Sequence, residues 1–169
     1  MILETRQQHW SDEAACEATA RALARHPGLR RACIELHGPL GAGKTTFARH
    51  LLRSLGVTGR IKSPSYAIVE PHEVPATTTA DNRDKLDKLD IWHFDFYRFG
   101  DPREWEDAGF RDLFASPGLK LVEWPEKAAG LLPVADLVLS LSPQDDDSRT
   151  AHWQAGTPLG ATLLNETLP

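Results

Sequence analysis

The sequence has few cysteines, no long apolar run and no excess of basic residues. Of its 169 residues only Cys16 and Cys33 are cysteines, and their spacing fits neither a disulfide framework nor a C-x-x-C metal site. No apolar run approaches the roughly 20 residues that span a bilayer, and the first residues lack a signal-peptide pattern. The formal net charge of −5 argues against a broad nucleic-acid-binding surface. We therefore expect a cytoplasmic protein without a membrane segment, folded as a single domain over residues 1–169.

Residues 38–45 read G-P-L-G-A-G-K-T and fit the phosphate-binding pattern G-x-x-x-x-G-K-[ST], with Thr46 directly after them. The three glycines let the backbone curl so that successive N–H groups face phosphate oxygens. Lys44 brings a positive charge to the β- and γ-phosphates, and the hydroxyl of Thr45 can ligand Mg²⁺. Alternation over 31–37 predicts a strand before the loop, and apolar spacing over 44–55 predicts a helix after it. The motif and its context predict nucleotide binding.

Two carboxylates at predicted strand ends are candidates for binding Mg²⁺ or for orienting the attacking water. The segment 91–98 alternates strictly, which places Asp95 on the same face as His93. Asp95 is either a second anchor for Mg²⁺ or a solvent-facing strand residue. Glu123 ends the apolar strand predicted over 119–124, where α/β sheets collect ligands. It either orients the attacking water or holds Mg²⁺, or else it is a surface cap.

The remaining segments predict the frame around this loop. Ser63, Ser65 and Tyr66 form either a nucleotide-sensing switch or a plain surface turn. The polar segment 71–90 predicts a poorly ordered insertion. Helices are expected over 12–25, capped by Ser11, over 101–114, capped by Asp101 and broken at Gly109, and over 157–164. Residues 1–10 are expected to form a strand or an irregular lead. Further strands are expected over 135–141 and over 149–154, the latter as an antiparallel edge. The order predicts an α/β fold, a three-layer sandwich of the P-loop NTPase type with a mostly parallel sheet and an antiparallel edge.

Four segments together resemble the bacterial TsaE (YjeE) family. They are 38–46 (G-x-L-G-A-G-K-T-T), 63–66 (S-P-[TS]-Y), 93–98 (H-F-D-x-Y-R) and 122–126 (V-E-W-P-E). The first is generic, whereas the other three in this order are specific, and the resemblance extends from about residue 2 to residue 164. It implies a weak Mg²⁺-dependent ATPase that acts on a complex of two partners, TsaD and TsaB. That complex forms N6-threonylcarbamoyladenosine at position 37 of tRNAs, so contact with tRNA would be indirect.

The resemblance also implies roles for particular residues. Thr45 and Glu123 match Mg²⁺ ligands, and Asp95 matches an acidic residue assigned to Mg²⁺ or to catalysis. The predicted catalytic residues are Lys44, Asp95 and Glu123. Trp124 matches a tryptophan next to the site, and Arg149 matches an arginine near the adenine. The predicted nucleotide contacts are Gly38, Gly41, Ala42, Gly43, Lys44, Thr45, Thr46, Ser63, Ser65, Tyr66, Trp124 and Arg149.

Three departures from the family pattern remove no catalytic group. Pro39 stands where an acidic residue is usual, Ser65 replaces the commoner threonine, and the segment 71–90 is longer than usual. An arginine that stabilises the transition state could come from Arg98 or Arg111 or from a partner. Two alternatives stay open from the sequence: a small-molecule kinase using the same loop, and a nucleotide-gated binding module that need not hydrolyse ATP. The oligomeric state is also open.

Overall fold

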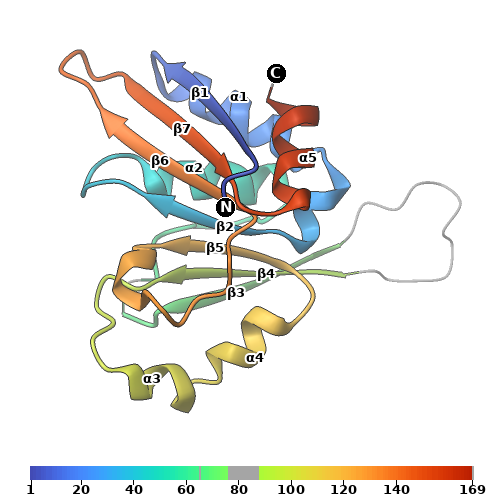
Figure 1. Cartoon of the computed structure of the whole chain (residues 1–169), viewed down its shortest axis with the longest axis vertical. Helices are drawn as coiled ribbons and strands as arrows, with labels where there is room; N and C mark the ends of the chain where they lie inside the picture. Colours follow the sequence, from blue (N-terminus) through green and yellow to red (C-terminus); the bar gives the residue numbers. More distant parts are fainter. Residues whose placement is uncertain (65, 76–87, 169) are drawn as a thin grey trace, which may run out of the picture.

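The computed structural model describes residues 1–64, 66–75 and 88–168, and in that part of the chain seven strands form one sheet in the order β1-β7-β6-β2-β5-β4-β3 (Figure 1). The strands are β1 (Glu4–Trp10), β2 (Cys33–His37), β3 (Val69–Pro75), β4 (Lys88–Asp95), β5 (Leu119–Glu123), β6 (Leu137–Pro143) and β7 (Arg149–Ala155). The helices are α1 (Glu13–Ala24), α2 (Lys44–Ser54), α3 (Pro102–Asp107), α4 (Phe110–Ala115) and α5 (Pro158–Thr167), with short 3-10 turns at Pro27–Arg31 and Pro125–Ala128.

The centre of the sheet is parallel and both of its sides are antiparallel. Strands β6, β2, β5 and β4 run parallel to one another, as the predicted α/β fold requires. Strand β7 pairs antiparallel with β6, and β1 pairs antiparallel with β7. The expectation of a mostly parallel core with an antiparallel edge is confirmed. The segment 149–154 is antiparallel as predicted, but it is not an edge, because β1 adds a further strand outside it.

One core lies between the sheet and the helices α1, α2 and α5. Helix α1 begins after Asp12, whose carboxylate accepts a hydrogen bond from the backbone N–H of Ala15 at 3.0 Å, so Asp12 and not the predicted Ser11 caps it. Helix α2 buries the apolar face expected from its spacing, including Phe47 and Leu51. In Figure 1 these three helices lie next to the part of the sheet that contains β1, β7, β6 and β2.

Phe47 lies at the centre of this core. Its ring is fully buried, stacks on Trp10 at a centroid distance of 6.0 Å and meets Trp153 edge-on at 5.6 Å. We expect Phe47→Ala to lower the free energy of unfolding by about 3–5 kcal/mol, because it removes a buried ring and leaves a cavity. Urea denaturation followed by circular dichroism measures the change. Val134→Ala, at a side chain that is 73% exposed, is the control and should leave the midpoint nearly unchanged.

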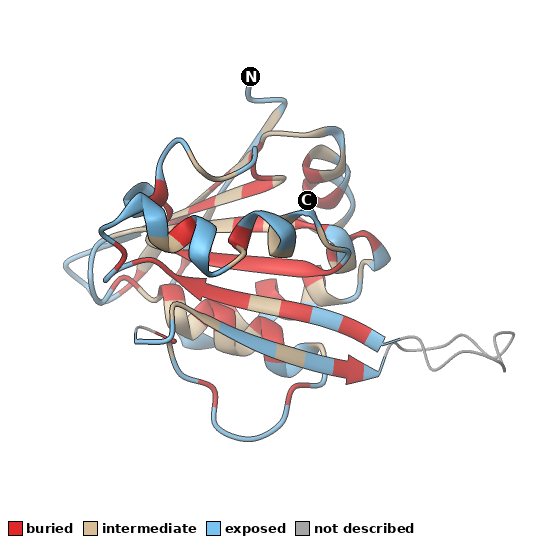
Figure 2. Ribbon diagram, turned by 90° about the horizontal axis from the view of Figure 1, so that it is seen from below, coloured by how far each residue is buried: buried red, intermediate tan, exposed pale blue. Residues whose placement is uncertain are grey.

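A second, aromatic core lies on the opposite face of the sheet under α3 and α4. Successive residues of β5 point to opposite faces, so Leu121 joins the first core and Val122 the second. Asp101 caps α3 in a capping box, and Gly109 separates α3 from α4 with a backbone φ of 68°, both as predicted. Figure 2 shows the buried residues in the strands and on the inward faces of the helices. With helices on both faces, the three-layer arrangement is confirmed.

The prediction of a poorly ordered insertion over 71–90 is wrong at both ends of that segment. Residues 71–75 belong to β3 and residues 88–90 to β4, and the two strands pair antiparallel from Val69↔Phe94 to Pro75↔Lys88. Residues 76–87 lie outside the described part of the chain. The polar composition misled the prediction because β3 is an edge strand, where exposed polar residues and prolines are tolerated. Only Val74 and Leu89 are buried in this part of the hairpin.

Two further expectations concern cysteines and membrane segments. Cys16 and Cys33 are free thiols, and Cys16 is buried whereas Cys33 is half-buried. Burial raises the pKa of both thiols to about 12, so they are poor nucleophiles. Among the described residues, no helix has the length and apolar character needed to cross a membrane.

Candidate functional site

The glycine-rich loop joins the end of β2 to the start of α2, as the motif requires. Gly43 precedes the helix with φ of 107°, a left-handed conformation that side chains rarely adopt. Gly38 has φ of 147°, and a Cβ at this position would lie 2.8 Å from the carbonyl oxygen of Leu141. The loop is therefore packed against β6, which fixes where its backbone N–H groups lie.

Lys44 is enclosed by the loop and by an aromatic ring. The residue is only 5% exposed, and its Nζ donates to the carbonyl oxygen of Gly38 at 2.5 Å. The same Nζ lies 3.4 Å from the ring centroid of Trp124, within the range of a cation–π contact. Burial lowers the pKa of Lys44 from its usual value, while the nearby carboxylates, Glu123 foremost, oppose that shift. The structure thus places a shielded cation beside the loop.

Glu123, the foremost of the carboxylates near Lys44, is hydrogen-bonded to Thr45. Glu123 ends β5 and is 2% exposed, and its Oε1 accepts a hydrogen bond from the Thr45 hydroxyl at 2.7 Å. Its Oε2 lies 2.6 Å from Nε2 of His93, a fully buried residue of β4. The alternative that Glu123 is a surface cap is therefore wrong.

Asp95 lies beside Glu123, because the two residues are partners in the β4–β5 register. It is 3% exposed, so the alternative of a solvent-facing strand residue is wrong as well. One oxygen accepts from the backbone N–H of Tyr97 at 2.9 Å, and the other accepts from the hydroxyl of Ser63. Asp95 is thus held by the segment that the sequence proposed as a switch.

A cavity of about 410 Å³ brings most of the predicted site residues together. Besides residues 40–46 of the loop, its lining includes Ser63, Asp95, Tyr97, Arg98, Glu123, Trp124 and Arg149. Trp124 reaches it through a left-handed backbone (φ 55°, ψ 48°) and packs on Tyr97 at a centroid distance of 5.0 Å.

The predicted switch is only partly at this cavity. Tyr66 is 86% exposed and stacks on the guanidinium of Arg98 at 4.2 Å, so it lies at the rim. Ser65 lies outside the described residues. Of the two candidate arginines, Arg98 lines the cavity, whereas Arg111 is exposed on α4 and is not part of the lining.

A second cavity of about 220 Å³ lies on the other side of the loop. Ala42, Gly43, Thr46 and Arg149 line both cavities, and Nε of Arg149 donates to the carbonyl oxygen of Ala42 at 2.9 Å. The second cavity is lined by Trp10, Asp12, Glu13, Cys16, Ala42, Gly43, Thr46, Asp147 and Arg149. The wall of this cavity from β1 and α1 could not be predicted from the sequence, because no motif marks those residues.

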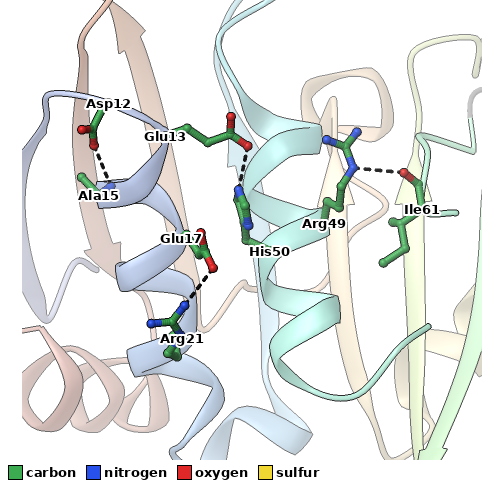
Figure 3. A network of polar contacts seen from close by, with 8 residues as sticks. All are labelled: Asp12, Glu13, Ala15, Glu17, Arg21, Arg49, His50 and Ile61. Carbon is green, nitrogen blue, oxygen red and sulfur yellow. Dashed lines mark hydrogen bonds and ion pairs between the residues drawn. The ribbon is translucent and has the colours of Figure 1, made fainter. Parts of the chain in front are cut away.

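Polar contacts connect the wall of the second cavity to α2 (Figure 3). Glu13 of α1 bonds His50 of α2 at 2.9 Å, and Arg49 of α2 donates to the carbonyl oxygen of Ile61 at 3.2 Å. Helix α2, which begins at Lys44, is thereby held between α1 and the segment that leads to Ser63. These contacts join α2 to a wall of the second cavity and to the segment before Ser63.

The arrangement suits a phosphate ester with a divalent cation. Among the described residues no group of three His, Cys, Asp or Glu side chains forms a ready-made metal site. Mg²⁺ is usually held by one or two carboxylates together with substrate phosphates and water, so it needs no such group. Thr45 donates its hydroxyl hydrogen to Glu123, which leaves oxygen lone pairs on Thr45 free for a cation. The residues therefore fit Mg²⁺ bound together with phosphates.

His93 contacts the site through Glu123, and sequence reasoning did not assign it a role. It was recognised as sharing a strand face with Asp95, and that alternation was the available signal. Its contact with Glu123 depends on the parallel pairing of β4 with β5, which the sequence alone does not specify.

Comparisons with known proteins agree on one family. A family model described as "Threonylcarbamoyl adenosine biosynthesis protein TsaE" matches residues 10–151. Two proteins named "tRNA threonylcarbamoyladenosine biosynthesis protein TsaE" are similar to the chain. The protein of Haemophilus influenzae is 38% identical over 78% of this chain and 75% of its own length. The protein of Bacillus subtilis is 33% identical over 72% of this chain and 68% of its own length. The crystal structure of Bacillus subtilis YdiB has a similar fold, with a TM-score of 0.71 and 23% identity over 99% of this chain and 95% of that one.

Proposed function

The chain belongs to the TsaE family of threonylcarbamoyl adenosine biosynthesis proteins, and from this premise we propose that it is an Mg²⁺-dependent ATPase of tRNA modification. The observation that carries the proposal is the cavity in which the glycine-rich loop, Lys44, Thr45 and Glu123 converge. An ATPase needs a cradle for phosphates, a cation site and a carboxylate near both. Those requirements account for the buried charges of this cavity.

The loop and Lys44 would hold the phosphates. Backbone N–H groups of residues 41–46 lie at the start of α2, where the helix dipole also favours an anion. Lys44 would exchange the carbonyl oxygen of Gly38 for phosphate oxygens. The second cavity, which shares Arg149 and part of the loop with the first, would take the base of the nucleotide.

Thr45 and Glu123 would hold Mg²⁺, with Asp95 acting directly or through water. Bound Mg²⁺ would neutralise charge on the phosphates during hydrolysis. One of the two carboxylates orients the attacking water. Arg98 would stabilise the transferring phosphoryl group, because it lines the cavity and its guanidinium stacks on the exposed ring of Tyr66.

We propose that the ATPase acts on a complex of TsaD-like and TsaB-like proteins, and reaches tRNA only through that complex. The negative net charge supports indirect contact with tRNA. A role in tRNA modification would require the protein to be in the cytoplasm. One sheet runs through both cores, which supports treating residues 1–169 as a single domain.

The test is ATP hydrolysis by the purified protein alone and with the TsaD–TsaB pair from the same organism. We expect slow turnover alone and a rise of at least about tenfold with the pair, because a partner can complete the transition-state contacts of a P-loop ATPase. The pair without this protein is the control for contaminating ATPases. If the protein binds ATP but the pair does not raise its rate of ATP hydrolysis, that result would contradict partner activation and favour the kinase or the nucleotide-gated module.

A further inference from the structure

We propose that His93 is a positioning residue that orients Glu123 for the Mg²⁺-bound nucleotide, an inference that rests on the proposed function. The hydrogen bond of His93 is to Glu123 and not to a residue of the loop. It acts through the carboxylate of Glu123, which in turn contacts Thr45.

The two oxygens of Glu123 are held from two different elements. Oε2 lies 2.6 Å from Nε2 of His93 on β4, and Oε1 accepts from the hydroxyl of Thr45 on α2. A carboxylate only accepts hydrogen bonds, so Nε2 of His93 is the donor. With both oxygens occupied, the carboxyl group cannot rotate without breaking a buried hydrogen bond. The hydroxyl hydrogen of Thr45 is therefore held in its hydrogen bond to Glu123. The lone pairs of the same oxygen are then left for a cation in the cavity.

Packing alone does not account for a histidine at this position. The side chain is fully buried, and among the described residues its Nδ1 has no hydrogen-bond partner. A leucine of comparable size would fill the space without an unpaired nitrogen. The contact with Glu123 is therefore the interaction that distinguishes histidine from an apolar residue here.

The effect of His93 should be confined to Glu123. Asp95, two residues further along the same strand face, is held by Ser63 and by the backbone of Tyr97. Lys44 is held by Gly38 and Trp124. Loss of the His93 contact should therefore weaken the Mg²⁺-dependent part of nucleotide binding and leave the Mg²⁺-independent part in place.

Three substitutions separate this role from a structural one. His93→Leu removes the donor. His93→Gln keeps an N–H group that reaches the place of Nε2, and His93→Asn carries the same amide on a side chain that is one methylene shorter. The measurement is the affinity for ADP by calorimetry, with excess Mg²⁺ and with EDTA, after thermal unfolding has shown that each variant is folded.

We expect His93→Leu and His93→Asn to lose about ten- to a hundredfold in affinity with Mg²⁺, the usual cost of removing an outer-shell partner of a metal ligand. Affinity in EDTA should be unchanged, and His93→Gln should recover most of the loss. Equal Mg²⁺-dependent affinities for the Gln and Asn variants would overturn the inference, even if the Leu variant does not fold. So would a parallel loss with and without Mg²⁺. If the unaltered protein itself shows no Mg²⁺-dependent binding, the proposed function fails, and this inference with it.

Discussion

Replacement of Lys44 by alanine is expected to abolish nucleotide-dependent activity. The variant loses the only buried lysine ammonium among the described residues that line the large cavity. Contacts of this kind, made in a site sheltered from water, contribute about a hundred- to a thousandfold to turnover. Both binding and hydrolysis should fall, because the ammonium contacts phosphates in the ground state as well as in the transition state. Calorimetry with ATP and phosphate release under the same conditions measure the two effects.

Lys88→Ala is the matched control for this substitution. Lys88 begins β4, at the opposite end of that strand from Asp95, and is paired with Glu73 at 2.6 Å on the surface. Its loss should change neither binding nor turnover, since exposed ion pairs contribute little. Turnover by Lys44→Ala at the rate of the unaltered protein would refute the assignment of the loop as the nucleotide site.

Glu123→Gln should separate binding from hydrolysis. Glutamine keeps the size of the side chain and can still accept from the Thr45 hydroxyl, but it removes the negative charge beside the predicted Mg²⁺ position. We expect turnover to fall by about a hundredfold or more, the range for a group that assists proton transfer or charge stabilisation. At saturating concentrations ATP should still bind, although the Mg²⁺-dependent part of its affinity falls, whereas Lys44→Ala loses affinity both with and without Mg²⁺. Single-turnover phosphate release, with bound ATP measured in parallel, distinguishes the two effects.

Glu126→Gln is the control, because Glu126 follows three residues later and its side chain is 47% exposed. It should hydrolyse ATP normally. Unchanged turnover by Glu123→Gln would remove Glu123 from the mechanism. Unimpaired modification of tRNA by the same variant, with ATP bound but not cleaved, would favour the nucleotide-gated module over the ATPase.

Local signals in the sequence predicted the parts of the structure that depend on local geometry. The loop pattern predicted a curled backbone at the glycines, and Gly38 and Gly43 have positive φ angles. Asp101 with its neighbours predicted the capping box of α3. The sequence predicts Glu123 at the carboxyl end of a strand, where α/β sheets collect ligands, and leaves a surface cap as the alternative. Its hydrogen bond from Thr45 agrees with that prediction.

Features that depend on distant partners were not predictable in this way. The edge position of β1 follows from its pairing with β7, which lies at the other end of the chain. The β3–β4 hairpin was hidden by a polar composition that an edge strand tolerates. The link from His93 to Glu123 needs the register between β4 and β5. Strand pairing of this range is a tertiary property, so composition and periodicity cannot specify it.

The most direct test of the account is equilibrium binding of a non-hydrolysable ATP analogue by calorimetry, with Mg²⁺, with EDTA, and with a GTP analogue as competitor. The account predicts one nucleotide bound per chain, tighter binding with Mg²⁺ than with EDTA, and little competition by the GTP analogue. Lys44→Ala should bind far more weakly under each condition. Absence of binding by the unaltered protein, or binding that survives Lys44→Ala unchanged, would contradict the account.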